Sequence, residues 1–172
     1  MNKKTIRIII AVILFLLILL YFFGCQNNTQ AKMEAQNIEI VKTAWSEWSN
    51  HNIEFFYDFY DQEDYKYYAP FINTEPESFE EIISGMEKVW TNYPDITFSI
   101  ENIFASGDLV VTMLVIKATH TQEIENRPPP TGQELEFSSI NIVRFESGKV
   151  VEEWENTDLL GFLKQLGYEL KN

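Results

Sequence analysis

His120 is the side chain in this sequence best suited to acid/base chemistry near neutral pH, because an imidazole has an unperturbed pKa of about 6.5. It comes near the end of the apolar run Leu109 to Thr121, which we predict to be a central strand. Counting in twos predicts that His120 points inward, together with Val110, Leu114, Ile116 and Ala118. It is then either an acid/base group that faces a ligand or a hydrogen-bonded packing residue.

A second polar side chain, Asn141, interrupts a mostly apolar strand face. In the alternating stretch Glu134 to Phe145 it shares the inward face with Leu135, Phe137, Val143 and Phe145. An amide donates and accepts hydrogen bonds but has no accessible proton equilibrium, so Asn141 could polarise a ligand without exchanging a proton with it. We expect His120 and Asn141 to face one cavity from different strands.

Aromatic residues make up 15% of the chain, and some of them are expected to line a pocket. Trp154 is the largest side chain of the strand Val150 to Asn156, and we place it inward, which puts Glu155 on the opposite face. Two tryptophans on one helix, Trp45 and Trp48, are more often core than pocket.

Other chemistries find little support in the residue spacing. With two histidines and one cysteine, a zinc site would need carboxylates that no spacing motif groups together. The sequence has no glycine-rich phosphate loop and no G-x-S-x-G nucleophile turn. We therefore expect neither a metal nor a cofactor.

The elements that must position these residues begin with helices. Apolar spacing predicts helices over Glu34 to Asn50, from Ile53 to the acidic cluster at Asp61, and over Phe79 to Trp90. Thr74 and Glu77 have capping-box spacing ahead of the third helix.

Strands follow the helices. We predict them over Ile96 to Ile100, Leu109 to Thr121, Glu134 to Phe145 and Val150 to Asn156. The turn at Ser147-Gly148 should join the last two as a hairpin. Asp158 then caps a closing helix that ends at Gly167. Helices followed by a run of antiparallel strands predict an α+β fold.

The N-terminus carries a separate signal. Basic residues at Lys3, Lys4 and Arg7 precede the apolar run Ile8 to Phe23 and then Gly24-Cys25. This pattern is typical of a signal peptide, and the run is slightly short for a membrane span of about 20 residues. An uncleaved signal anchor is the alternative. Cys25 is the only cysteine, so no intrachain disulfide can form.

The net charge of −13 limits the partners of this chain. The first 24 residues contain basic and no acidic side chains, so the remainder is more acidic still. Such a domain repels nucleic acid and anionic lipid headgroups, and nucleic acid is excluded as a partner. Its acidity is explained by solubility.

The C-terminal third resembles a known family. Phe145 to Trp154, followed by Asp158 to Gly167, is similar to the C-terminal signature of SnoaL-like proteins, the polyketide-cyclase and ester-cyclase branch of the nuclear transport factor 2-like superfamily. Tyr93-Pro94-Asp95, Thr119-His120-Thr121 and Pro130-Thr131-Gly132 recur in that order in the family. The resemblance covers roughly Ile38 to Gly167.

The resemblance implies a strongly curved antiparallel sheet that N-terminal helices close into a cone, with a short first strand at Tyr65 to Tyr68. It implies a cofactor-free pocket for a small, largely apolar molecule. The residues expected to bind this molecule are Trp45, Tyr67, Tyr68, His120, Asn141 and Trp154. SnoaL-like cyclases carry an acid/base aspartate where this chain has Asn141, and the family's frequent Glu-His-Trp appears here as Glu152-Glu153-Trp154. Gly24-Cys25 resembles the lipobox of bacterial lipoproteins, which implies a lipidated Cys25 on the outer face of the cytoplasmic membrane.

These observations divide the chain into a signal peptide or anchor over residues 1–24, a polar tether over 25–36 and a SnoaL-like domain over 37–172. If extended, the tether would span about 35–40 Å. Two functions are compatible with the domain, and a homodimer is compatible with either. We favour a surface lipoprotein that binds an apolar ligand without turnover, because Asn141 replaces the aspartate. The alternative is a cyclase-type enzyme that uses His120 as acid/base.

Overall fold

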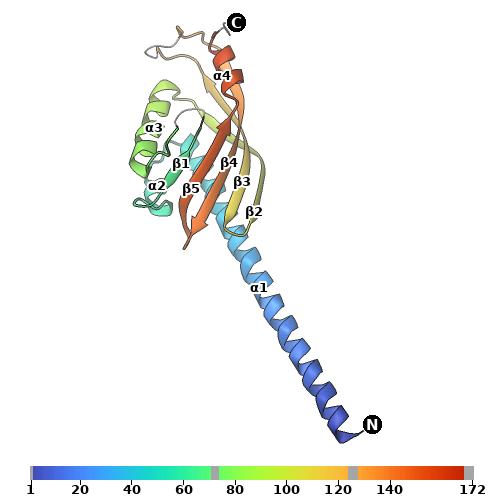
Figure 1. The fold of residues 1–172 in the computed structure, drawn as a ribbon. Coiled ribbons are helices and arrows are strands. Elements are labelled where there is room, and N and C mark those ends of the chain that lie inside the picture. Colours follow the sequence, from blue (N-terminus) through green and yellow to red (C-terminus); the bar gives the residue numbers. More distant parts are fainter. Residues whose placement is uncertain (1, 71–73, 124–127, 169–172) are drawn as a thin grey trace.

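The computed structural model describes residues 2–70, 74–123 and 128–168, except for the side chains of residues 4–12 and 16–27. It contains helices followed by strands, as an α+β fold requires (Figure 1). The elements are α1 (Lys3–Ser49), α2 (Glu54–Phe59), β1 (Lys66–Tyr68), α3 (Phe79–Asn92), β2 (Thr97–Ser106), β3 (Leu109–Thr119), β4 (Glu134–Glu146), β5 (Lys149–Thr157) and α4 (Leu159–Gln165).

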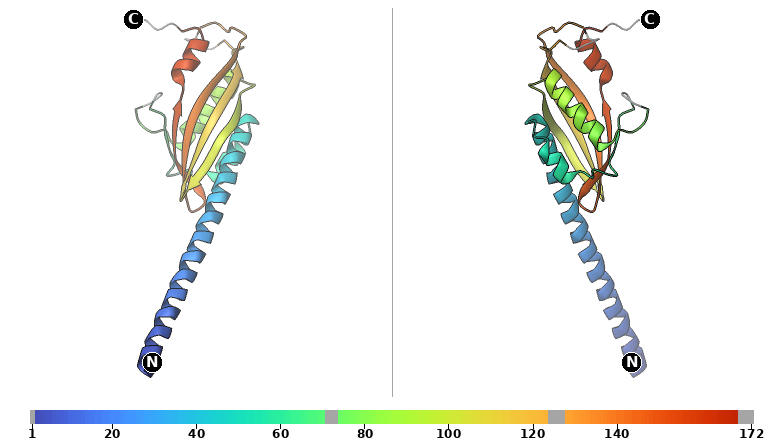
Figure 2. Two further views of the ribbon diagram at one scale, coloured as in Figure 1. Left: turned by 90° about the vertical axis from the view of Figure 1, so that its right-hand side faces the viewer. Right: turned by 90° about the vertical axis from the view of Figure 1, so that its left-hand side faces the viewer.

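The five strands form one sheet in the order β1-β5-β4-β3-β2. Strands β2 to β5 pair antiparallel, whereas β1 pairs parallel with β5, so the sheet is mixed where we expected it to be antiparallel throughout. The direction of a three-residue strand is set by the helices around it. The residues of the strand itself do not encode this direction. Helix α3 lies over one face of the sheet, and none of the described helices covers the opposite face (Figure 2).

Helix α1 is much longer than the predicted helix from Glu34. It runs without a break from Lys3 to Ser49 and projects from the domain (Figure 1). The expected tether over 25–36 is therefore helical, and at 1.5 Å per residue it spans about 18 Å instead of 35–40 Å. Contact with the domain has begun by Glu34, whose Oε1 accepts a 2.7 Å hydrogen bond from the Gly107 backbone N–H. The C-terminal part of α1 packs on β2 and β3.

Within the described part of the chain, no helix combines the length and apolar character needed to cross a membrane. The backbone of residues 25–27 belongs to α1, but the side chain of Cys25 lies outside the described residues.

The N-cap of helix α3 lies four residues later in the chain than the N-cap of the expected capping box. Ser78, not Thr74, is its N-cap: the Glu81 N–H donates to Ser78 Oγ, and the Ser78 N–H donates to Glu81 Oε2 over 2.7 Å. Glu77 cannot start the helix because its backbone exchanges two 2.9 Å hydrogen bonds with Tyr67. The cap fixes α3 so that Phe79, Ile83 and Met86 are buried.

The β4–β5 hairpin forms as predicted, with an additional β-bulge. Ser147 and Gly148 both have positive φ, 51° and 82°, as a two-residue type I′ turn requires. Phe145 then pairs with Val150, but Arg144 pairs with Glu152, so Val151 is an extra residue in β5. A bulge of this kind exchanges the two faces for the rest of the strand. Glu153 and Glu155 therefore point inward and Trp154 points outward, the reverse of the expected orientation.

The outer face of the sheet carries a row of apolar side chains in register. Phe104 pairs with Val111, Val111 with Ile142, Ile142 with Trp154, and Trp154 with Tyr68, which crosses all five strands. Trp154 and Tyr68 stack with ring centroids 5.6 Å apart and an interplanar angle of 9°. Both residues were expected in the pocket, and both belong to this outer row.

Candidate functional site

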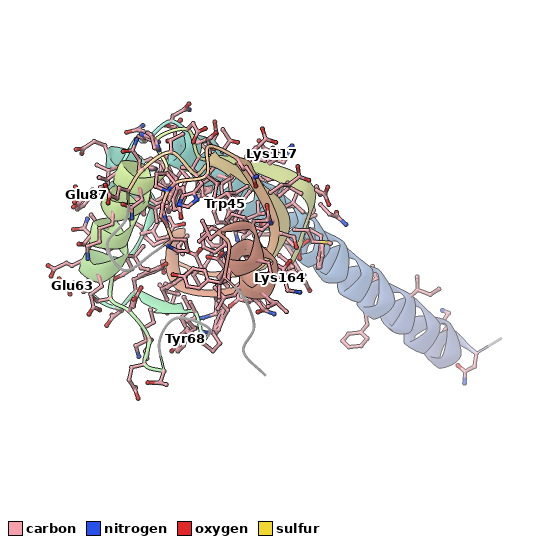
Figure 3. The ribbon with its side chains drawn as sticks, turned by 90° about the horizontal axis from the view of Figure 1, so that it is seen from above. Trp45, Glu63, Tyr68, Glu87, Lys117 and Lys164 are labelled. Atoms are coloured by element: carbon pink, nitrogen blue, oxygen red, sulfur yellow. The ribbon has the colours of Figure 1, made fainter. Side chains whose placement is uncertain are left out.

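A cavity of about 440 Å³ lies between the sheet and the helices. Its apolar lining comes mainly from α1, α3 and the inward faces of the strands, and includes Val41, Trp45, Phe79, Ile83, Met86, Phe98, Ile116, Phe137 and Val143. Its polar lining includes Tyr60, Tyr65, Tyr67, Glu77, Asn92, Tyr93, Glu153, Glu155 and Thr157. Seen from above, Trp45 lies inside the ring of elements and Tyr68 lies at its edge (Figure 3).

Glu153 is the most unusual group in this lining, because a carboxyl that is 7% exposed stands in an apolar surrounding. Its Oε1 accepts a 2.6 Å hydrogen bond from Asn141 Nδ2, and its Oε2 accepts a 2.9 Å hydrogen bond from the Tyr65 hydroxyl. Tyr60 also hydrogen-bonds to this carboxyl. Donors from the C-cap of α2, from the residue before β1 and from β4 thus converge on one side chain of β5. Buried carboxylates persist only where such donors replace water.

Opposing effects set the protonation of Glu153. Burial disfavours the charged form and raises its pKa most, and the nearby Glu155 carboxylate raises it further. The hydrogen bonds from Asn141, Tyr65 and Tyr60 stabilise the charged form and lower the pKa. The balance raises the pKa of Glu153 to about 7. Both protonation states are therefore populated near neutral pH, which suits a group that gives and takes protons.

Glu155 lies two residues further along the same face of β5 and has a different environment. Its Oε1 accepts from the hydroxyls of Ser139 and Thr157 over 2.8 and 2.6 Å, and its Oε2 accepts from Tyr67 over 2.6 Å. Three hydroxyl donors therefore hold this carboxyl in place. Glu155 was expected on the outer face, and the bulge at Val151 is the reason that it lies here.

The three tyrosines that meet these carboxyls remain hydrogen-bond donors. Burial and the neighbouring carboxylates raise the pKa values of Tyr60, Tyr65 and Tyr67 well above the ordinary value of a phenol. They stay protonated across the physiological range, so they donate to Glu153 and Glu155 whatever the pH of the surroundings.

Two of the expected ligand-binding residues, Trp45 and Tyr67, line the cavity. Asn141 points inward and is fully buried, but it touches the site through Glu153 and is not itself a lining residue. Its Oδ1 has no hydrogen-bond partner in the described chain. Asn141 is thus a positioning residue behind the carboxyl.

His120 is fully buried but does not line the cavity. Its Nδ1 lies 3.4 Å from the Thr131 hydroxyl, and its Nε2 has no partner within the described residues. The backbone N–H of His120 donates to the carbonyl of Gln133, which precedes Asn141 by eight residues. At about 3.3 Å per residue, that separation is up to 26 Å along the strand. The expected single cavity shared by His120 and Asn141 therefore does not form.

Sequence reasoning missed Glu153, Tyr60 and Tyr65. One signal for Glu153 was available: Val150 and Val151 are consecutive apolar residues directly after a tight turn, and both are buried. Two adjacent buried residues at the start of a one-face strand indicate a bulge. Tyr60 and Tyr65 gave no signal, because they flank the acidic loop between α2 and β1. Across the described residues, no three His, Cys, Asp or Glu side chains are grouped so that they could hold a metal.

An α+β domain whose five-stranded sheet and helices enclose an apolar cavity, with a buried carboxyl in the cavity wall, has the nuclear transport factor 2-like fold. The chain belongs to the SnoaL-like polyketide cyclase family, whose sequence model matches residues 38–166. No curated protein matches the chain.

Solved structures share the fold. IdmH from Streptomyces antibioticus, a candidate polyketide cyclase, is 24% identical with a TM-score of 0.69, and the match covers 76% of this chain and 97% of that one. A candidate polyketide cyclase from Acidithiobacillus ferrooxidans is 28% identical with a TM-score of 0.65, over 75% of this chain and 92% of that one. AclR from Streptomyces galilaeus, a candidate hydroxylase, is 25% identical with a TM-score of 0.67, over 83% and 89%.

Proposed function

We propose that this protein is a surface lipoprotein whose cone-shaped cavity binds a small, largely apolar molecule that carries a hydrogen-bonding group. The single observation that carries the proposal is the apolar cavity with one buried carboxyl, Glu153, set in its wall. Ligand pockets combine an apolar lining with a few placed polar groups in this way. The apolar lining supplies affinity, and Glu153 and Glu155 orient the polar end of the ligand.

The size of the cavity limits the ligand. About 440 Å³ accommodates a molecule of a few rings and excludes a peptide helix or a nucleic acid. An anionic ligand is disfavoured, because the described residues of the lining include three carboxyls and no basic side chain. A neutral molecule with a carbonyl or hydroxyl group fits both limits.

Attachment to the membrane is supported by the sequence. The basic start, the apolar run Ile8 to Phe23 and Gly24-Cys25 form a lipoprotein-type signal. A diacylated Cys25 would supply two acyl chains, which is enough for stable anchoring. The ligand-binding domain would then stand at the extracytoplasmic face of the membrane, held there by the helix that follows Cys25.

Glu153 adds a titratable group that the prediction of binding without turnover did not include. That expectation rested on Asn141 in place of the acid/base aspartate of the family. A carboxyl on the neighbouring strand is in hydrogen-bond contact with this amide, so a titratable group is present at the site after all. A cyclase-type activity is the second candidate function. If it is correct, Glu153 and not His120 is the group that exchanges the proton.

Nile red, a neutral dye that fluoresces in apolar surroundings, tests the binding function. The full-length protein in detergent should bind it at one site and raise its fluorescence above that of the detergent. Ile83→Trp fills the cavity from α3 and should abolish this signal. Ile140→Trp makes the same change on the outer sheet face, where Ile140 is 47% exposed, and should keep it. Equal dye binding by the two variants would refute the proposal.

A further inference from the structure

We infer that Glu153 is a catalytic residue of this domain, a general acid and base that moves a proton at the carbon next to a carbonyl group of a small apolar ligand. The inference rests on the proposed binding function and extends it from binding to turnover. It transfers the acid/base role from β4 to β5, because the amide Asn141 occupies β4 and the carboxyl facing it belongs to β5.

The Glu153 carboxyl is held in a fixed position in the wall of the cavity. The side chain lines the cavity, so a bound ligand touches it. Asn141 Nδ2 holds one carboxyl oxygen at 2.6 Å and the Tyr65 hydroxyl holds the other at 2.9 Å. These donors come from β4 and from the residue directly before β1, and both strands pair with β5. A catalytic base must be held in one orientation, and these two hydrogen bonds hold the Glu153 carboxyl in this way.

The surroundings allow Glu153 to change its protonation state. Burial favours the neutral acid, while the amide and two phenols favour the carboxylate, so neither form is strongly preferred near neutral pH. A carboxyl without these donors would stay protonated in an apolar cavity, and an exposed carboxyl would stay ionised. Glu153 meets the condition for giving and taking a proton under physiological conditions.

Two other candidates for the proton transfer fit less well. Glu155 also accepts three hydrogen bonds, but it is only partly buried, so water reaches this carboxyl, whereas Glu153 is buried in the cavity wall. His120 lies at the far end of the strands and does not line the cavity. Glu153 is therefore the group in contact with a ligand that the structure equips for the reaction.

The proposed step needs no second reactant. The Glu153 carboxylate takes the proton from the carbon beside the carbonyl, and the electron pair of the broken C–H bond forms the C=C bond of an enolate. The carbonyl π pair moves onto oxygen. The protonated Glu153 then returns a proton to carbon, either the same one or one exchanged with solvent. Trp45 lines the same cavity, and its indole N–H has no partner in the described chain, so it offers a donor to the enolate oxygen.

The test uses 1-tetralone, a small apolar ketone, carrying deuterium at the carbon next to its carbonyl. Loss of deuterium to water is followed by mass spectrometry with the full-length protein. Displacement of Nile red by the ketone shows beforehand that it occupies the cavity. We expect exchange well above the rate without protein, with a rate that rises with pH and levels off above about 7 as Glu153 ionises.

Glu153→Gln keeps the shape of the side chain and should slow the exchange about a hundredfold, within the range usual for a general base. Glu152→Gln is the matched control: it makes the same change one residue away on the outer face, where Glu152 pairs with Arg144, and should keep the wild-type rate within twofold. Circular dichroism and dye binding confirm that each variant is folded.

The outcomes separate the inference from the binding function. If neither dye nor ketone binds, the binding function fails and the inference fails with it. If the ketone binds but exchanges no faster than in buffer, or if Glu153→Gln exchanges at the wild-type rate, the inference alone is overturned. A rate that does not change between pH 5 and pH 8 would also overturn it, and this measurement needs no variant.

Discussion

Asn141 on β4 donates a 2.6 Å hydrogen bond to the carboxyl of Glu153 on β5, and both side chains are buried. An amide that donates to a carboxylate stabilises its charged form, whereas burial destabilises it. The contact therefore determines how readily Glu153 loses its proton. It also joins Asn141, where we expected the aspartate of the family, to the residue that we propose as the acid/base group.

The raised pKa of Glu153 makes a prediction about stability. The folded state holds this proton up to about pH 7, whereas an unfolded glutamate releases it near its ordinary pKa of 4.5. Since the folded state binds the proton more tightly, this group favours folding most at low pH, and stability falls as pH rises from 4.5 to 7. The loss amounts to about 3 kcal/mol.

Glu153→Gln removes this titration. Relative to the wild type, its free energy of unfolding in urea should improve by about 3 kcal/mol between pH 4.5 and pH 8. Glu152→Gln on the outer face corrects for the loss of one charge. A difference between wild type and Glu153→Gln that is the same at both pH values would show that Glu153 titrates normally.

Asn141→Asp should not simply restore the site of the family. The new carboxyl would face Glu153 across a contact of 2.6 Å, where two carboxylates cannot both be ionised. They would share one proton, and the variant should lose stability as the pH rises from 5 to 8. We expect it to be several kcal/mol less stable than the wild type at pH 8 and close to it at pH 5.

Urea unfolding at both pH values measures this effect. Asn141→Ala is the comparison: it removes a donor and so also raises the pKa of Glu153, but it adds no second carboxyl. Its loss of stability at pH 8 should be the smaller of the two. An Asn141→Asp protein as stable at pH 8 as at pH 5 would mean that the two side chains do not meet.

Much of the fold could be predicted from the sequence, because the relevant signals are local. The two-residue alternation predicted the inward faces of β3 and β4, and Ser147-Gly148 predicted the turn between β4 and β5. The orientation of β5 could not be obtained by the same counting. One extra residue, Val151, reverses the face to which every later side chain of β5 points. An alternating pattern counted from Val150 does not include such an insertion.

The candidate site was harder to predict than the fold. Its donors Tyr60 and Tyr65 stand near the ends of α2 and β1, and they reach Glu153 only when β1 pairs with the far edge of the sheet. Their roles depend on contacts between residues about 90 positions apart in the chain. His120 was chosen for its chemistry, but strand length separates it from Asn141, and side-chain parity alone does not give that distance.

Trp45 and Trp154 should differ in their effects on ligand binding. Trp45 lines the cavity and Trp154 lies in the outer row against Tyr68. Trp45→Ala should weaken Nile red binding by at least tenfold and destabilise the fold by about 3–5 kcal/mol, as truncation of a buried aromatic does. Trp154→Ala should leave the dye affinity within twofold. The opposite result would place the functional pocket on the outer face of the sheet.

Cys25→Ala tests the membrane attachment. If Cys25 is the lipidated first residue, mass spectrometry of the wild type should find a chain that starts at Cys25 with a diacylglyceryl group. The variant should keep residues 1–24 and carry no lipid. A wild-type chain with residues 1–24 intact and an unmodified thiol would identify the N-terminus as a signal anchor instead.

The most direct test of the account is the protonation midpoint of the Glu153 carboxyl itself. Carbon-13 NMR of full-length protein labelled at the glutamate side-chain carboxyls can follow it from pH 4 to pH 9, with the signal assigned by its absence in Glu153→Gln. Our account predicts a midpoint of about 7 and a shift of this signal when Nile red fills the cavity. A midpoint near the ordinary glutamate pKa of 4.5, unchanged by the dye, would contradict it.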